Sequence, residues 1–296
     1  MSRRVGLLDV DGSKNFPNLP LMKLSAYHKK QGDTVEWLNL FEHYDIVYKS
    51  KVFGFTPDFE YAIRADEIIE GGTGYKHIDL KATLPAEIEH IMPDYSLYPQ
   101  FKEAYGFLSR GCPRNCGFCI VSEKEGRCSV QVADVDQFWT NQKTIKLLDP
   151  NLLACKDHEK LLIQLAETNA YVDFTQGLDI RLVNKDNIAL LNHLKTKMLH
   201  LAWDNPKEDL TDKFKWFAEN TTVDDERKRT VYILTNWNST HEEDLYRVYM
   251  LRSQGFSPYV MIYDKQNAPK ITRKLQRWVN NRFIFRSTKT FDEYVG

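Results

Sequence analysis

Three of the chain's five cysteines, Cys112, Cys116 and Cys119, lie within eight residues of one another in the spacing Cys-x3-Cys-x2-Cys. Glycine and proline residues are interleaved with them and allow the backbone to wind tightly. Thiolates so close in sequence can converge on one metal centre, and cysteine thiolates hold iron–sulfur clusters, commonly four to a [4Fe–4S] cluster. Three ligands leave one iron of such a cluster open to a substrate or cofactor. The loop therefore predicts an iron–sulfur centre with an open iron.

Zinc and disulfides are the alternatives for these cysteines. A structural zinc site needs a second ligand pair, and the chain after Cys119 offers only Cys128, Cys155 and His158, at no zinc spacing. Five cysteines without a secretory signal disfavour disulfides. We therefore rank an iron–sulfur cluster above zinc. Cys128 and Cys155 are interpreted as free thiols, with ligation of a second cluster as the alternative.

The cysteine loop resembles the signature of the radical S-adenosylmethionine (radical SAM) enzymes, because the aromatic Phe118 directly precedes the last cysteine. This resemblance implies a [4Fe–4S] cluster on Cys112, Cys116 and Cys119, with S-adenosylmethionine bound to the open iron through its amino and carboxylate groups. Reductive cleavage of that cofactor would give a 5′-deoxyadenosyl radical. It also implies an electron donor such as a flavodoxin or ferredoxin, and a place for Phe118 at the cofactor.

The bulk composition is that of an ordinary globular protein. A length of 296 residues predicts about two domains or one large one. The net charge of -1 gives no overall electrostatic attraction for nucleic acid or membranes. No apolar run reaches the length of a membrane helix, and the first residues do not resemble a signal peptide. We expect a cytoplasmic protein without a membrane partner.

The first part of the chain predicts a small, mostly parallel α/β unit. Short apolar runs at 5–10, 34–40, 45–48 and 66–69 are expected strands, and 18–31 has helical spacing. The glycine-rich stretch 71–74 lacks the Walker Lys-Ser/Thr pair and the G-x-G-x-x-G spacing, so it predicts a tight turn where two backbones come close. Asp9 and Asp11 are interpreted as turn residues.

This unit resembles the cobalamin-binding-like, Rossmann-like domain that precedes the catalytic domain in many radical SAM enzymes. The family marker for cobalamin with a histidine ligand, Asp-x-His-x-x-Gly, does not occur in the sequence. We therefore expect a degenerate version that does not bind cobalamin. The expected domains are 1–95 and 96–296, with 85–104 as the linker.

The second part of the chain predicts an α/β domain of about six strand–helix units. Expected strands lie at 105–109, 143–148, 171–175, 198–202, 230–234 and 258–263. Expected helices lie at 157–168, 187–195, 209–219, 242–254 and 270–280, and 283–285 is expected to add a final strand. The resemblance implies that these units form a partial (β/α)6 barrel with a C-terminal extension.

Polar residues follow these strands, at the edge where the active site of a parallel barrel lies. The candidates are Asp149, Asn151, Gln176, Arg181 and Asp204. The family often has Gly-Gly-Glu after the second strand to contact the methionine amino group, and this chain has Asp149-Pro150-Asn151 there instead. Arg181 is predicted to pair with the cofactor carboxylate. Pairing of Arg181 with Asp179 or Asp204 is the structural alternative.

The sequence thus leads to an enzyme of the radical SAM type, an iron–sulfur oxidoreductase or transferase. Its substrate can be a small molecule, a peptide or a nucleic acid. The alternative is a non-catalytic iron–sulfur or zinc-binding module that uses the same cysteines for redox sensing or regulation.

Overall fold

The structure is a computed structural model that describes residues 2–12 and 15–295. It divides into two compact units. The first comprises the described residues up to Gly106 together with Val135–Gln142, and the second comprises Phe107–Asp134 and the described residues from Lys143 onward. None of the helices in the described ranges is both long and apolar enough to cross a membrane.

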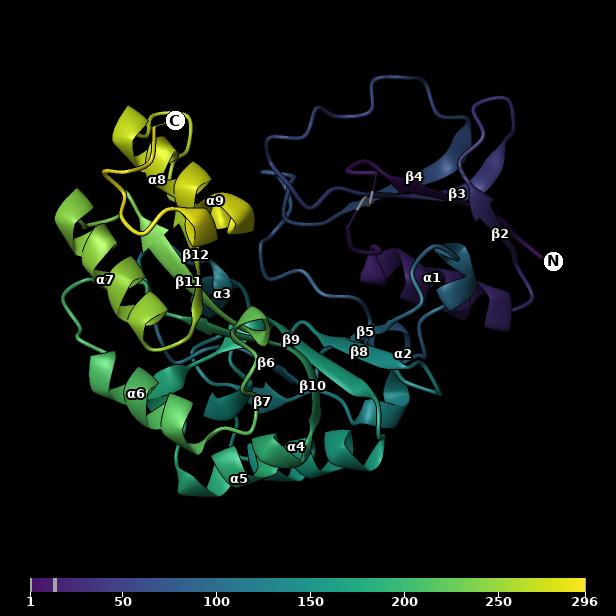
Figure 1. Cartoon of the computed structure of the whole chain (residues 1–296). Coiled ribbons are helices and arrows are strands. Elements are labelled where there is room, and N and C mark those ends of the chain that lie inside the picture. Colours follow the sequence, from purple (N-terminus) through teal and green to yellow (C-terminus); the bar gives the residue numbers. More distant parts are fainter. Residues whose placement is uncertain (1, 13–14, 296) are drawn as a thin grey trace. The chain divides into compact units, whose positions relative to one another are not determined.

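The first unit is built on a four-stranded parallel sheet of order β2-β1-β3-β4 (Figure 1). The strands are β1 (Arg4–Asp9), β2 (Thr34–Trp37), β3 (Tyr44–Ser50) and β4 (Ala65–Gly71). Helix α1 (Leu19–Lys30) is capped by Asn18, whose side chain accepts a hydrogen bond from the backbone N–H of Leu21. Leu21 and Leu24 of this helix pack on Val5 and Leu7 of β1, which makes the core of the unit.

The glycine-rich turn confirms the expectation of a close backbone approach. Gly72 has φ +102°, and a Cβ there would lie 2.2 Å from the carbonyl oxygen of Lys51. Beyond it, the stretch expected to be only a linker contains helix α2 (Ala86–Glu89) and a 3-10 turn at Tyr95–Leu97, followed by β5 (Ala104–Gly106). The expected strand 105–109 is therefore divided between β5 and the next strand, β6 (Ser109–Arg110).

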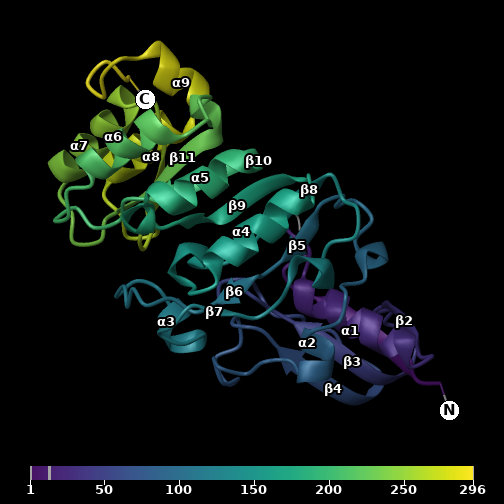
Figure 2. The ribbon, with the colours of Figure 1, turned by 90° about the horizontal axis from the view of Figure 1, so that it is seen from below.

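The second unit alternates strands and helices. Its strands β8 (Thr144–Leu147), β9 (Tyr171–Leu178), β10 (Lys195–Ala202), β11 (Arg229–Thr235) and β12 (Ser257–Ile262) are parallel neighbours in chain order. Between and after them come α4 (His158–Glu167), α5 (Lys185–His193), α6 (Thr211–Asn220), α7 (His241–Ser253) and α8 (Lys270–Asn280). The helices α4–α8 lie along one side of this sheet (Figures 1 and 2).

Side chains alternate between the two faces of this sheet, as the period of two in a strand requires. Val172, Val231 and Val260 are fully buried on the helix-covered face. The intervening residues, including His200 and Tyr259, belong to the opposite face, where Tyr259 is exposed. Every carboxyl end of the five strands is at the same edge, so the loops that follow them are brought together.

Two local expectations were wrong. Residues 283–285 are helical, within α9 (Arg282–Ser287), because Asn281 caps that segment by accepting hydrogen bonds from the N–H groups of Phe283 and Ile284. Helix α5 ends at His193 rather than at 195, because Leu194 has an extended backbone and Lys195 already pairs with Tyr171 of β9.

Candidate functional site

The cysteine loop lies between the two strands of a short antiparallel pair. β6 pairs with β7 (Val130–Gln131), and the loop between them contains the short helix α3 (Val121–Lys124). The N–H of Cys112 donates to the carbonyl of Gly126, and Gly111 has φ +89°. A Cβ at Gly111 would lie 2.0 Å from the carbonyl oxygen of Cys128, so no larger residue fits there. The local backbone therefore depends on the glycine that precedes the first cysteine.

All three loop cysteines are free thiols. Cys112 and Cys116 are half-buried and Cys119 is exposed. Burial raises the pKa of the Cys116 thiol, and the neighbouring Cys119 and Cys112 raise it further. Ionisation of Cys116 therefore responds to both other sulfurs, as expected for three thiols of one loop. Cys155 is buried and Cys128 is exposed, and both are free thiols.

The cysteines fit an iron–sulfur cluster by their chemistry rather than by a preformed cage. Among residues 2–12 and 15–295, no three His, Cys, Asp or Glu side chains are arranged as a metal-binding group. The donor set nevertheless consists of three unpaired thiols on one short loop. The amide Nδ2 of Asn151 also donates a hydrogen bond to Cys112 Sγ at 3.5 Å, and hydrogen bonds to sulfur tune the potential of such clusters.

Asn151 has one buried polar atom without a partner. The residue is buried, its backbone carbonyl accepts from the Ser129 hydroxyl, and its side-chain Oδ1 has no hydrogen-bond partner among the described residues. If the side-chain oxygen and nitrogen of Asn151 are assigned the other way round, the nitrogen takes the buried position and lacks a partner instead. An unsatisfied buried amide costs free energy, so it indicates a position where a ligand donor can bind.

Asp149 supports the segment that leads into the loop. One carboxylate oxygen accepts from the Leu108 N–H at 3.0 Å, and the other accepts from the N–H and hydroxyl of Ser109 at 2.5 and 2.8 Å. Burial raises its pKa to about 6, against the opposing effect of these hydrogen bonds. Both oxygens are therefore used by the protein itself, and Asp149 positions the chain just before Cys112.

Arg181 lies in a network of ion pairs beyond the end of β9. Its Nε donates to Asp179 at 2.6 Å and its Nη1 to Glu208 at 2.9 Å, while Arg114 from the cysteine loop donates to the other oxygen of Asp179 at 2.7 Å. Burial opposes the charge of Asp179, but the hydrogen bonds and charges of the two arginines outweigh it and lower the pKa of that carboxyl. The pairing with Asp179, which was the structural alternative for Arg181, is thus present. It ties the cysteine loop to the loop after β9.

The other three predicted site residues differ in burial and in the partners they contact. Gln176 is exposed on β9. Phe118 meets the ring of Trp237 edge-on at 6.1 Å, and Trp237 in turn lies 4.4 Å from the ring of Tyr263. Asp204 accepts from the Leu234 N–H at 3.1 Å, and burial raises its pKa. Asp204 also influences the pKa of Cys116, as does Arg181, which brings these three residues into one electrostatic neighbourhood.

The sequence did not single out Arg247, which organises the carboxyl ends of two strands. Its guanidinium is almost fully buried and donates to the carbonyls of Trp203, Asp204 and Leu234, and to the Asp244 carboxylate. These residues come from the ends of β10 and β11 and from α7. The only signal in the sequence is the Asp244–Arg247 pair at i,i+3, which many exposed helices also contain.

A second set of residues that the sequence missed lies on the face of the sheet opposite α4–α8. His200 stacks on Tyr232 with ring centroids 5.1 Å apart and an angle of 6°. Its Nδ1 lies 3.1 Å from the Phe174 carbonyl and 3.6 Å from Asp173, and burial lowers the pKa of the imidazole. A carbonyl can only accept, so Nδ1 carries the proton and Nε2 keeps a lone pair.

The chain is similar to several solved structures at low sequence identity. Streptococcus suis SuiB bound to S-adenosylmethionine is 15% identical with a TM-score of 0.43, over 63% of this chain and 45% of SuiB. TsrM from Kitasatospora setae, a radical S-adenosylmethionine methyltransferase with cobalamin and a [4Fe–4S] cluster bound, is 12% identical with a TM-score of 0.45, over 88% of this chain and 66% of TsrM. The chain spans about half the length of the SuiB structures it matches. No family model and no curated protein matches it.

Proposed function

We propose that this chain is a radical SAM enzyme. The observation that carries the proposal is the loop with Cys112, Cys116 and Cys119, set beside the buried amide of Asn151. In this proposal the three thiolates hold a [4Fe–4S] cluster, and the second unit belongs to a partial (β/α)6 barrel. An electron from a flavodoxin or ferredoxin, passed through the cluster, would reduce bound S-adenosylmethionine and split one carbon–sulfur bond to give methionine and a 5′-deoxyadenosyl radical.

The residues around the loop suit the two ends of the methionine moiety. Asn151 Oδ1 is a buried acceptor without a partner, and an ammonium group is a donor that would satisfy it. Arg181 already donates its Nε–H to Asp179 and one Nη1–H to Glu208, so part of its donor capacity is used within the protein. Asn151 is therefore the stronger candidate for a direct contact, and Arg181 is the weaker one.

His200 and its neighbours suit a substrate contact. Asp173 and the Phe174 carbonyl fix the imidazole, and Tyr232 packs flat against it. The neutral ring offers Nε2 as an acceptor for a hydrogen bond or a proton on the side of the sheet that α4–α8 leave uncovered. ¹⁵N NMR of His200 tests this assignment, because Nε2 should be unprotonated at neutral pH.

The first unit is proposed not to bind cobalamin through a histidine, since Asp-x-His-x-x-Gly is missing. Its own chain fills the carboxyl edge of its sheet. Asp11 after β1 accepts hydrogen bonds from the backbone of Val52 and Phe53 and from the Thr56 hydroxyl. Asp9 accepts from the hydroxyl of Tyr98.

Anaerobic reconstitution with iron and sulfide tests the proposal. Each of Cys112→Ala, Cys116→Ala and Cys119→Ala should lose most of the bound iron and the brown colour, because two thiolates cannot replace three. Cys128→Ala and Cys155→Ala are matched controls and should keep both. The reduced wild-type protein should convert S-adenosylmethionine to 5′-deoxyadenosine.

Two outcomes would contradict this function. A cluster that forms but never yields 5′-deoxyadenosine favours the non-catalytic redox module. Zinc as the only metal after anaerobic expression with iron favours a zinc site.

A further inference from the structure

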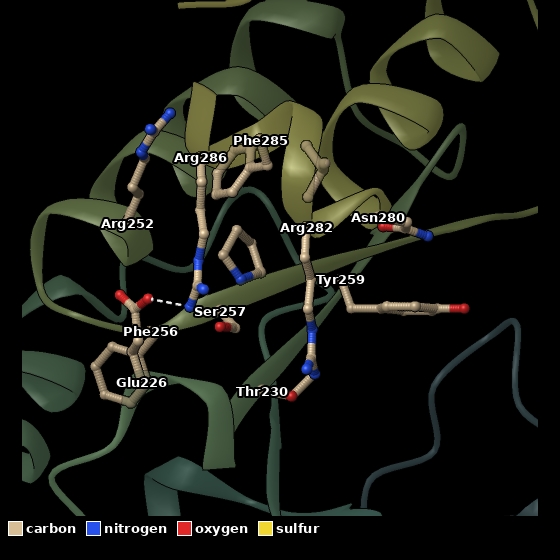
Figure 3. A pocket seen from close by; sticks show the side chains of 12 residues that line it. Glu226, Thr230, Arg252, Phe256, Ser257, Tyr259, Asn280, Arg282, Phe285 and Arg286 are labelled. Carbon is tan, nitrogen blue, oxygen red and sulfur yellow. Dashed lines mark hydrogen bonds and ion pairs between the residues drawn. The ribbon is translucent and has the colours of Figure 1, made fainter. Parts of the chain in front are cut away.

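A small hollow lies at the beginning of β11 and β12, the end of these strands opposite the cysteine loop. It has a volume of about 170 Å³ and is shown in Figure 3. Its walls come from the first residues of the two strands and from α7, α8 and α9. The apolar part is Phe256, Pro258, Val279 and Phe285. Three arginines, Arg252, Arg282 and Arg286, line the rest together with Glu226, Ser257 and Thr230.

The three arginines differ in how they are held. Arg252 donates through Nη1 to the carbonyls of Thr288 and Lys289 and lies over the Phe285 ring, so it is fixed at the edge of the hollow. Arg286 pairs with Glu226 at 2.6 Å. Arg282 has no hydrogen-bond or ion-pair partner in the part of the chain that the structure describes, and Figure 3 shows its side chain extending toward Thr230.

Arg282 and Arg286 are four residues apart on α9 and therefore lie on the same side of that helix. Two like charges at this spacing on a helix repel each other. Glu226 neutralises one of the two, through an ion pair whose side chains are both about half exposed and which therefore contributes little. The arrangement leaves one guanidinium charge uncompensated beside an open hollow.

Two hydroxyl groups in the same hollow are further, uncharged hydrogen-bond donors. Neither the Ser257 nor the Thr230 hydroxyl has a hydrogen-bond partner among residues 2–12 and 15–295, and both residues line the hollow. A hydroxyl can donate one hydrogen bond, and each guanidinium can donate several in a planar fork. Guanidinium forks and hydroxyls in one hollow match the several oxygens of a tetrahedral oxyanion.

We propose that this hollow binds a phosphate group, with Arg282 and Arg286 as the charged donors and Ser257 and Thr230 as the neutral ones. Glu226 competes for Arg286 and leaves it when phosphate binds. The site is independent of the cysteine loop, because it lies at the opposite end of the strands. It is thus a second ligand site, and its existence does not depend on the radical SAM proposal.

Calorimetric titration of the full chain tests the site, with inorganic phosphate as one probe and phenyl phosphate as the other. Saturable binding is expected for both. Tighter binding of phenyl phosphate would assign the site to a phosphate ester that also packs on Phe285, and equal affinities would assign it to free phosphate. No saturable binding of either probe would overturn the proposal.

Three variants locate the binding. Arg282→Ala should weaken phosphate binding about tenfold, as for the loss of a charge-assisted hydrogen bond. Arg277→Ala removes one exposed positive charge from α8, outside the hollow, and should change the affinity by less than about twofold because isolated exposed charges are screened. Glu226→Gln frees Arg286 and should tighten binding by about threefold.

Circular dichroism first establishes that each variant is folded. Equal weakening by Arg282→Ala and Arg277→Ala would show general attraction by the charge of the protein and would overturn the proposal. Weaker binding in Glu226→Gln would also overturn it, because it would make Glu226 part of the site rather than a competitor.

Discussion

The two units of the molecule use an aspartate in the same way and with different consequences. In the first unit, Asp11 accepts two successive backbone N–H groups and a hydroxyl from the loop after β3. In the second, Asp149 accepts the two successive N–H groups of Leu108 and Ser109 and the Ser109 hydroxyl. Each aspartate follows a strand and holds a segment distant in sequence.

The difference between them is burial. Asp149, Leu108 and Ser109 are all buried, and the pKa of Asp149 is raised to about 6. Asp11 is half-buried, and Phe53 and Phe55 in the loop it holds are exposed. Water can replace the carboxylate of Asp11 as the hydrogen-bond acceptor, because its site is partly exposed. No water can reach the buried N–H groups from which Asp149 accepts hydrogen bonds.

The same hydrogen-bond pattern thus holds an exposed loop in the first unit and a buried segment in the second. The aspartate of the first unit holds a loop whose two phenylalanines are exposed. The aspartate of the second unit fixes the entry to a loop whose three thiols must act together. A rigid entry suits ligands that need a defined geometry.

The largest effect is expected from Asp149→Ala. It leaves two buried N–H groups and a hydroxyl without an acceptor, which should lower the free energy of unfolding by about 3–5 kcal/mol. Urea unfolding followed by circular dichroism measures this. Reconstituted iron should fall with it, since the cysteine loop loses its support. A stable variant with full iron content would show that Asp149 does not hold the loop.

A smaller change in the free energy of unfolding is expected when the pH changes. The pKa of Asp149 is raised to about 6 in the folded protein, above the ordinary value of 3.8, so the folded state binds more protons between these values. This contribution to the free energy of unfolding is fully present below pH 3.8 and is lost as pH rises from there through about 6, by about 3 kcal/mol.

Asp149→Asn does not titrate and serves as the reference for that experiment. The difference in unfolding free energy between wild type and Asp149→Asn should change between pH 5 and pH 7 in favour of the variant. A constant difference over this range would contradict a pKa of about 6 for Asp149.

The smallest effect is expected from Asp11→Asn. The amide keeps one acceptor oxygen, and water can reach the remaining donors, so the free energy of unfolding should fall by only about 0.5–1 kcal/mol. Faster amide hydrogen exchange at Val52 and Phe53 should accompany it. A loss as large as that of Asp149→Ala would remove the distinction between the two loops.

The order of strands and helices in the second unit could be predicted from the sequence because its strands appear as short, mostly apolar runs separated by segments with helical spacing. Helix α7, expected to start at 242, starts at His241, where the Thr240 side chain caps it by accepting from the Glu243 N–H. The prediction of a strand at 283–285 was wrong because Phe-Ile-Phe has the composition of a strand. Its helical state depends on Asn281 capping two N–H groups.

The site could be predicted only as a set of residues near one edge. Asp149 and Arg181 were placed after strands, but their partners depend on contacts that no local pattern encodes. Asp149 binds residues 40 and 41 positions earlier, and Arg114 reaches Asp179 across 65 positions. The role of Arg247 could not be predicted, because charged residues of a helix are usually exposed, whereas this one is buried.

Arg247 also determines when the edge of the sheet can be completed during synthesis of the chain. The carbonyls of Trp203, Asp204 and Leu234 emerge from the ribosome before the guanidinium that binds them. Until α7 has been made and has docked, these carbonyls lack their guanidinium donor. The carboxyl ends of β10 and β11 therefore reach their final arrangement late, after the cysteine loop has already been synthesised.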